Sequence, residues 1–312
     1  AYSNCDSVLL YNDMSNEKVT YLGRKKNNGT GTHFMWENRD IRYNVLRAVG
    51  YYKGKAVVED ILVLNGLEQA PHFGILYQDT KPLLKGEDGY NYLYRINCGG
   101  DDFTDSFGQL WMQDNTNYSR SWATSFNELN PYLASQRTTS DPIRGSRDWK
   151  LFQHFRFGRH QLEYNFPVAD GMYRIEFYFT EPWHGTGGSA SADCEGLRIF
   201  DVAVNDSVVL DDLDIWAESG HDGACKKVVY AIVKGGLLKI HFPEVKAGQA
   251  LISGIAIASA NSDSKPTLFP ASDWNWEKAS KEVMEKTPKE LLPEDKNAPV
   301  SYTHLTLPTS DL

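Results

Sequence analysis

The chain has 312 residues, a length that suggests two domains. Its net charge of −9 and isoelectric point near 5.4 argue against a nucleic-acid backbone or an anionic membrane surface as the main partner, and they suit a neutral ligand. No apolar run approaches the roughly 18 residues that a membrane span requires. Tryptophan and tyrosine are abundant, with 8 and 17 residues, and such side chains either offer flat faces to ligands or fill β-sandwich cores.

Residues 1–67 predict an all-β module. Short apolar and aromatic runs alternate with turns rich in Gly and Asn, and Lys53-Gly54 is expected to close a hairpin. The expected strands are Val8–Tyr11, Tyr21–Gly23, Thr32–Trp36, Tyr43–Tyr52 and Ala56–Leu64. This pattern favours an immunoglobulin-like sandwich, followed over residues 68–91 by a linker that packs between domains.

Residues 92–260 predict a second β-sandwich or jelly roll, because many short strands follow one another without a convincing amphipathic helix. Gly99-Gly100 is expected to form a sharp turn, and residues 115–148 read as loop. The expected strands are Tyr92–Asn97, Trp149–Phe157, Gly158–Phe166, Met172–Phe179, Leu197–Val204, Ser207–Leu210, Lys226–Val233, Leu237–Phe242 and Ala250–Ala258. Residues 261–300 predict a polar linker with one short helix, and residues 301–312 a non-native tail.

Four stretches in this second module resemble malectin-type carbohydrate-binding domains. They occur in the family's order and at compatible spacing, and they are residues 94–100 (YRINCGG), 172–183 (MYRIEFYFTEPW), 200–216 (FDVAVNDSVVLDDLDIW) and 250–258 (ALISGIAIA). The resemblance implies a malectin-like jelly-roll sandwich whose partner is an oligo- or polysaccharide.

The N-terminal module resembles the immunoglobulin-like domain that follows the catalytic barrel in glycoside hydrolase family 2, of which many members are β-galactosidases. The similar phrases are YSNCDSVLLY, YLGRKK and RAVGYYKGKAVVEDILV, with an insertion at Met14–Thr20. The resemblance implies a C-terminal fragment of a bacterial glycosidase, truncated at its N-terminus, covalently linked to a catalytic barrel and located in the periplasm or outside the cell.

Sugar sites need aromatic side chains on loops, where they stack on apolar sugar faces, beside polar groups that bind hydroxyls. The segment from Glu181 through Trp183 and His184 to Gly188 fits this need, although Trp183 could instead cap the end of the core. The resemblance adds further candidates, and in it His184 and Phe157 depart from the usual aromatic and tyrosine. These further ligand candidates are Phe157, Tyr118, Trp122 and Gln249.

Some of these candidates have an equally simple structural explanation. Phe155 and Phe157 share one face of their expected strand, so both could belong to the core. His221, which precedes Asp222, could face the ligand or close a turn.

No catalytic residue, cofactor or metal ion is expected. Glycosidases need two carboxylates held about 5–10 Å apart, and Asp211, Asp212 and Asp214 read instead as turn or cap residues. The Asp101–Asp114 stretch lacks the spacing of a calcium loop. The four cysteines lack the spacing of a zinc site, and Cys194 and Cys225 form either a disulfide or two thiols.

Three functions fit the sequence. The first is a non-catalytic module that targets a glycoside hydrolase to polysaccharide. The second is a structural or oligomerising role of both sandwiches, and the third is an extension of the parent enzyme's substrate site.

Overall fold

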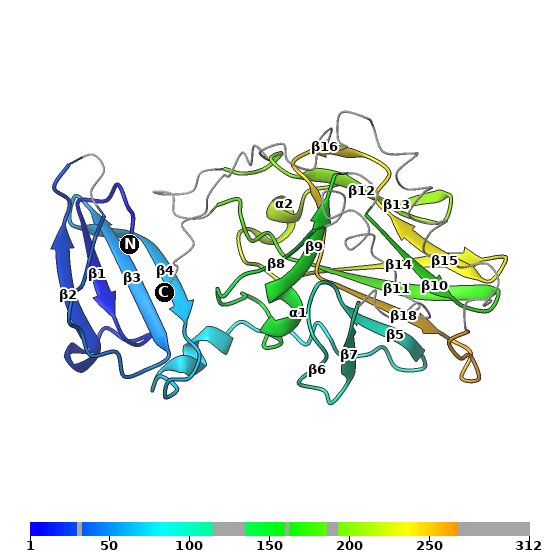
Figure 1. Ribbon diagram of the computed structural model, residues 1–312, viewed down its shortest axis with the longest axis horizontal. Coiled ribbons are helices and arrows are strands. Elements are labelled where there is room, and N and C mark those ends of the chain that lie inside the picture. Colours follow the sequence, from blue (N-terminus) through cyan, green and yellow to red (C-terminus); the bar gives the residue numbers. More distant parts are fainter. Residues whose placement is uncertain (30–32, 115–134, 160–161, 186–192, 268–312) are drawn as a thin grey trace, which may run out of the picture.

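The computed structural model describes residues 1–29, 33–114, 135–159, 162–185 and 193–267. It consists mainly of β-strands in several sheets, which confirms the all-β prediction. A small N-terminal sheet lies at one end, and a larger sandwich forms the rest (Figure 1). Within the described residues, no helix is both long and apolar enough to cross a bilayer.

The N-terminal part forms one four-stranded antiparallel sheet in the order β2-β1-β3-β4. Its strands are β1 (Ser7–Tyr11), β2 (Tyr21–Lys26), β3 (Val45–Tyr52) and β4 (Lys55–Val63), and the 3-10 turn η1 (Lys18–Thr20) lies between the first two. Lys53 and Gly54 both have positive φ, as the predicted hairpin turn requires. The strand expected at Thr32–Trp36 is wrong in its described part, which contributes a single bridge between His33 and Tyr2.

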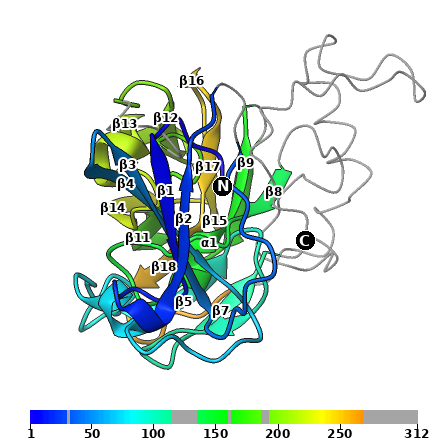
Figure 2. The same ribbon diagram turned by 90° about the vertical axis from the view of Figure 1, so that its left-hand side faces the viewer.

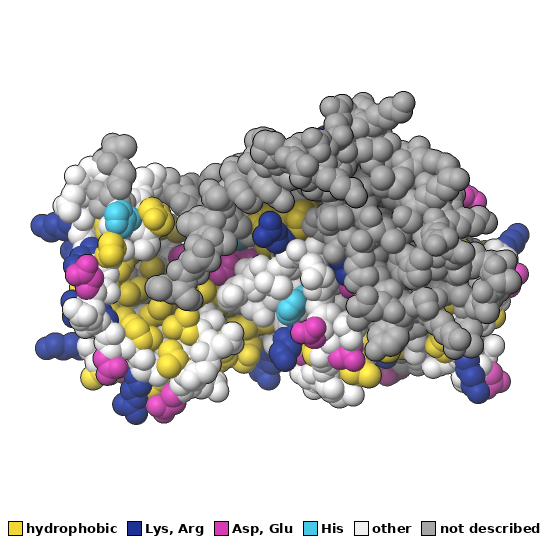
Figure 3. Space-filling model, in the orientation of Figure 1, with side chains coloured by type: hydrophobic (Ala, Val, Ile, Leu, Met, Phe, Trp, Pro, Cys, Tyr) yellow, Lys and Arg dark blue, Asp and Glu magenta, His cyan; other side chains and the backbone are white. Residues whose placement is uncertain are grey.

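This N-terminal sheet keeps much of its surface in contact with water. Figure 3 shows hydrophobic side chains gathered over it, and Tyr21, Tyr52 and Val57 are among its exposed ones. The described residues of this part form one sheet, whereas an immunoglobulin-like sandwich has two. The assignment to that fold therefore stays a prediction.

The segment 68–91 contributes to a continuous apolar cluster between the two parts. It contains the 3-10 turn η2 (Phe73–Tyr77), and its residues Phe73 and Leu84 are buried. The same cluster includes Val45 of β3 on one side and Trp149 on the other. Figure 2 shows the N-terminal strands in front of the sandwich when the molecule is seen from that end.

Two sheets face each other in the larger unit, and a third, shorter sheet closes one end. The first has the order β14 (Cys225–Val233), β11 (Gly171–Phe179), β18 (Gly254–Ser259), β5 (Asn91–Asn97), β7 (Leu110–Gln113) and β6 (Phe103–Thr104). The second has the order β10 (Glu163–Pro167), β15 (Leu237–His241), β12 (Ile199–Val204) and β13 (Ser207–Leu213), with β16 (Val245–Ala247) paired to β12. The third has the order β17 (Ala250–Ile252), β9 (His154–Gly158) and β8 (Ser135–Thr138).

Strand β11 is buried on both faces. Its residues Ile175 and Phe177 enter the main core between the two large sheets, as the alternation in the sequence predicts. Glu176 and Tyr178 point the opposite way and are also buried, because the linker, Trp111 and the short helix near β9 cover that outer face. The core therefore has two layers that share one sheet.

Several expectations were wrong in detail. Gly158 ends β9, so the expected strand Gly158–Phe166 is present only as β10, and β8 lies inside the expected loop 115–148. Trp149–Phe157 begins with a helix, α1 (Trp149–Gln153), because three of its first four side chains bury together in the linker cluster. Only the remainder of that stretch is strand β9.

The expected strand Ala250–Ala258 divides at Ser253 into β17 and β18, which belong to different sheets. The backbone N–H of Ser253 donates to the carbonyl of Tyr178 over 2.9 Å, and its own carbonyl accepts from Cys98. A second short helix, α2 (Ile215–Ser219), follows β13. All four cysteines are buried thiols without a disulfide.

The turn that follows β5 requires glycine at position 99, and substitution there tests this requirement. Its φ is +74°, and a Cβ there would lie 2.9 Å from the carbonyl oxygen of Phe155. Gly108 has φ of +76° with no atom within 4 Å of its Cβ position, which makes it a matched control. Gly108→Ala should lower the free energy of unfolding by about 1–2 kcal/mol, and Gly99→Ala by a further ~1–3 kcal/mol from the steric conflict.

Urea unfolding followed by tryptophan fluorescence measures both changes. Equal losses in the two variants would show that the close approach of Gly99 to β9 has no energetic consequence.

Candidate functional site

The segment Glu181–Gly185, called here the platform loop, leaves the end of β11 and carries the best predicted ligand residues. Glu181 and Pro182 are buried, whereas Trp183 and His184 are half-buried. Gly185 has φ of +94°, and a Cβ there would lie 2.7 Å from the Nε1 atom of Trp216 in α2. The loop is thus seated against α2 at a point where only glycine fits.

A buried ion pair with Arg198 fixes the base of this loop. The Nε atom of Arg198 donates to a Glu181 carboxylate oxygen over 2.5 Å, and both side chains are about 1% exposed or less. The same carboxylate accepts the backbone N–H groups of Trp183 and His184 at 2.9 and 3.0 Å. Burial alone would raise the pKa of Glu181, but Arg198 and these N–H groups together hold the pKa below its usual value.

Arg198 also supports Trp183 from behind. Its guanidinium carbon lies 5.0 Å from the centre of the indole ring, in the range of a cation–π contact. Its Nη1 atom donates to the backbone carbonyl of Gln249 over 2.6 Å. One buried cation therefore connects the end of β11, the start of β12 and the entrance to β17.

Two phenylalanines of β9 complete an aromatic group around Trp183. Phe157 and Phe155 meet the indole edge to face, with ring centres 5.1 and 5.7 Å away. Phe155 is buried and Phe157 is half-buried. The core explanation for the two phenylalanines holds for Phe155, which is part of the main core. The explanation that Trp183 caps the core holds in part, because Trp183 packs against that core.

His184 is the polar neighbour of this aromatic group. Burial lowers the pKa of its imidazole below the usual value, against the opposing effect of the Glu181 carboxylate. A neutral imidazole has one donor nitrogen and one acceptor nitrogen. Such a ring can donate a hydrogen bond to a sugar hydroxyl or accept one from it.

The remaining predicted ligand residues lie at different distances from this group. His221 pairs with Glu181 through a backbone bridge, but its ring contacts Asp222 over 2.8 Å. Gln249 is half-buried where Arg198 reaches its carbonyl. Tyr118 and Trp122 lie outside the described residues.

Sequence reasoning missed Arg198, because no local pattern in the sequence marks it as buried. Arg198 lies in a bend just before β12 and is buried, so its guanidinium needs a buried anion. Glu181 ends the neighbouring motif and supplies that anion.

The acidic residues named in the sequence have structural roles in the described region. Asp214 caps α2 by accepting the N–H of Ala217 and also accepts that of Gly196, as its reading as a cap predicts. Asp105 accepts the indole N–H of Trp111, and Asp114 pairs with an arginine and a tyrosine.

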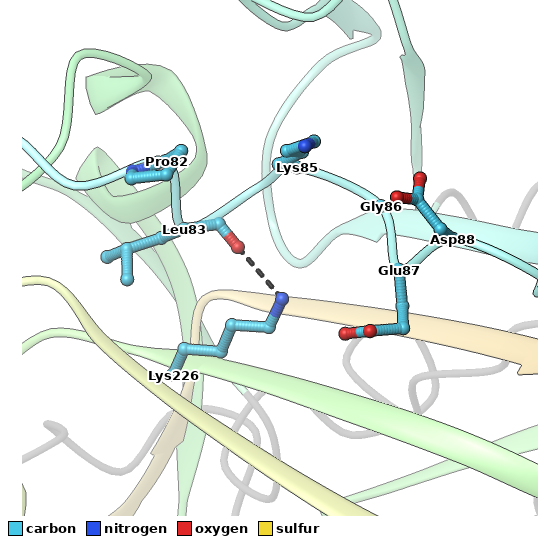
Figure 4. A pocket seen from close by; sticks show the side chains of 7 residues that line it. All are labelled: Pro82, Leu83, Lys85, Gly86, Glu87, Asp88 and Lys226. Carbon is cyan, nitrogen blue, oxygen red and sulfur yellow. Dashed lines mark hydrogen bonds between the residues drawn. The ribbon is translucent and has the colours of Figure 1, made fainter.

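A separate open pocket of about 370 Å³ lies between the linker and β14 (Figure 4). Lys226 crosses it, donating to the carbonyl of Leu83 over 2.9 Å and pairing with Glu176 over 2.9 Å. The other lining residues belong to the linker between Pro82 and Asp88. These contacts attach the linker to the sheet. They involve no residue of the platform loop.

Arg198→Met tests the ion pair. This substitution leaves the Glu181 carboxylate buried without its cation, so we expect the free energy of unfolding to fall by about 3–5 kcal/mol. The double variant Glu181→Leu/Arg198→Met removes both charges and should recover much of that loss. Denaturant unfolding gives the values, and Lys246→Met, which breaks the exposed pair with Asp212, serves as the control. A single variant as stable as the control would refute a structural role for the pair.

Comparison with solved structures finds only limited overall similarity. A Bacteroides uniformis beta-glucuronidase aligns with a TM-score of 0.42 and 22% identity, over 82% of this chain and 26% of that chain. The plant receptor-like kinase ANX2 aligns with a TM-score of 0.43 and 15% identity, over 54% of this chain and 48% of that one.

Comparison with curated sequences is more specific. Malectin of Danio rerio is 26% identical over 150 residues, which are 48% of this chain and 47% of that protein. Malectin-B of Xenopus laevis is 24% identical over 149 residues, 47% of this chain and 48% of that protein. The chain thus spans about half the length of these relatives. The family model of the malectin domain matches residues 92–261, more than half of the chain, and the chain therefore belongs to the malectin domain family.

Proposed function

We propose that residues 92–261 bind an oligo- or polysaccharide, without acting on it, through the platform loop. The observation that supports this most is the fixed position of Trp183, whose indole is backed by Arg198 and flanked by two phenylalanines. An aromatic ring held in this way can stack on the apolar C–H face of a sugar without losing side-chain freedom on binding.

Polar groups for the sugar hydroxyls lie beside the ring. His184 is half-buried, and burial lowers the pKa of its imidazole. Gln249 is half-buried where Arg198 joins the two segments. Phe157 extends the apolar surface. Glu181 is fully buried, and its role in our proposal is to hold Trp183 in place rather than to touch the ligand.

The proposal extends to the parent protein through the resemblance of residues 1–67 to a family 2 glycoside hydrolase domain. In that setting the module is part of a bacterial enzyme of the periplasm or the extracellular space. Holding the enzyme on a polysaccharide raises the local concentration of substrate around a linked catalytic barrel.

The test is calorimetric titration of the chain with galactan and glucan oligosaccharides. Trp183→Ala should weaken binding about tenfold or more, which corresponds to roughly 1.4 kcal/mol of lost stacking. Tyr52→Ala is the matched control, because Tyr52 is an exposed aromatic residue on the N-terminal sheet.

Circular dichroism and thermal melting establish that both variants fold. If the native chain and Trp183→Ala bind each oligosaccharide equally, or if neither binds at roughly millimolar ligand, the proposal fails.

A second candidate function, self-association, has one observation in its favour. Val228, Tyr230 and Ile232 alternate along β14 with 37%, 53% and 64% of their surface exposed, and β14 is an edge strand of its sheet. This exposed face of an edge strand can pack against the same face of a second copy around a two-fold axis. Light scattering should then show a dimer that Ile232→Lys converts to a monomer, whereas a native monomer at all concentrations would exclude this function.

A further inference from the structure

Three polar side chains that the proposed function does not use meet behind the platform loop. Asp141 lies between β8 and α1, and His221 and Asp222 lie between α2 and β14. One potential ligand atom from each of the three lies within 4.8 Å of the other two. We call them the Asp–His cluster.

The backbone around this cluster is firmly held. Arg144 and Gly223 form a parallel bridge, and the N–H of Arg144 donates to the carbonyl of Asp222 over 2.8 Å. The guanidinium of Arg144 donates to the carbonyls of Ser219 and His221 over 3.0 and 2.7 Å. The two segments that carry the cluster are therefore already in register.

Two atoms of the cluster are buried without a hydrogen bond. Asp222 is 7% exposed, and its Oδ2 atom contacts His221 Nε2 over 2.8 Å. Its Oδ1 atom and the Nδ1 atom of His221 have no partner within the described part of the chain. A buried carboxylate oxygen without a hydrogen bond is destabilising, so such atoms point to a ligand.

We propose that Asp141, His221 and Asp222 bind a divalent transition-metal ion, with Zn²⁺ as the best match. One imidazole nitrogen and two carboxylate oxygens form a donor set that zinc accepts at bond lengths of about 2.0–2.2 Å, whereas calcium prefers oxygen alone. Ligand atoms around a tetrahedral zinc ion are roughly 3.3 Å apart, so small side-chain movements are enough to close the cluster.

A water molecule would complete the coordination. An ion bound there would connect the segment between β8 and α1 with the segment between α2 and β14. This role is independent of sugar binding.

Calorimetric titration of the chelator-treated chain with ZnCl₂, in buffer without sugar, tests the site. We expect one ion per chain and a rise in melting temperature, because the ion binds the folded state. Asp222→Asn should weaken zinc binding about 100-fold. Asparagine is the suitable replacement, because residue 222 has φ of +50° and Asn tolerates that conformation.

Another acidic group within the described residues supplies the control. Asp201, Asp211 and Asp212 also place carboxylate oxygens within 4.8 Å of one another, but without an imidazole. Asp211→Asn should leave zinc affinity unchanged. Both variants must melt at the native temperature in chelator, and Asp141→Asn provides a second test if Asp222→Asn does not fold.

Several results would overturn the proposal. They are equal zinc affinity in the native chain and Asp222→Asn, loss of binding only in Asp211→Asn, tighter binding of CaCl₂ than of ZnCl₂, and no binding at roughly millimolar zinc. Zinc binding that persists in Trp183→Ala while sugar binding is lost separates this site from the proposed function.

Discussion

The ion pair between Glu181 and Arg198 is the interaction on which the candidate site depends. Removing two charges from water is unfavourable, and only good geometry with further hydrogen bonds offsets the loss. Here the carboxylate accepts two backbone N–H groups and the guanidinium donates to the carbonyl of Gln249. The pair therefore holds the start of the platform loop in place beside Trp183.

A second buried ion pair orients strand β9. Asp114 pairs with Arg156 of β9 over 2.5 and 2.9 Å and accepts the hydroxyl of Tyr164. Because Arg156 stands between Phe155 and Phe157, this pairing also fixes which face of β9 meets Trp183. Polar residues that face away from the main core thus orient the aromatic residues that face the site.

Much of this fold follows from the local sequence pattern. The alternation from Arg174 to Phe179 correctly indicates a strand, and it also indicates which side chains enter the core. Local pattern cannot show that the linker covers the opposite face. That cover is why Trp149–Gln153 becomes a helix, since its apolar residues find partners on a second cluster instead of along a ladder.

The site is less predictable than the fold, because its residues lie far apart in the sequence. Trp183 and His184 are recognisable because they adjoin a strong strand and several glycines. Arg198 becomes evident only when its burial is known. Asp141 and Asp222 are about eighty positions apart, and nothing in either local sequence indicates the other.

The platform loop and the Asp–His cluster share one stretch of backbone. The N–H of Asp222 donates to the carbonyl of Glu181 over 2.9 Å, while the Glu181 side chain is held by Arg198. Two sites influence each other through conformational entropy only when one of them orders a segment that the other needs. The ion pair and the Arg144 contacts already order this segment in the folded chain. Binding of a ligand at Trp183 or of an ion at Asp222 would therefore order this backbone little further. The shared backbone positions both sites, and we expect each ligand to change the affinity for the other only weakly.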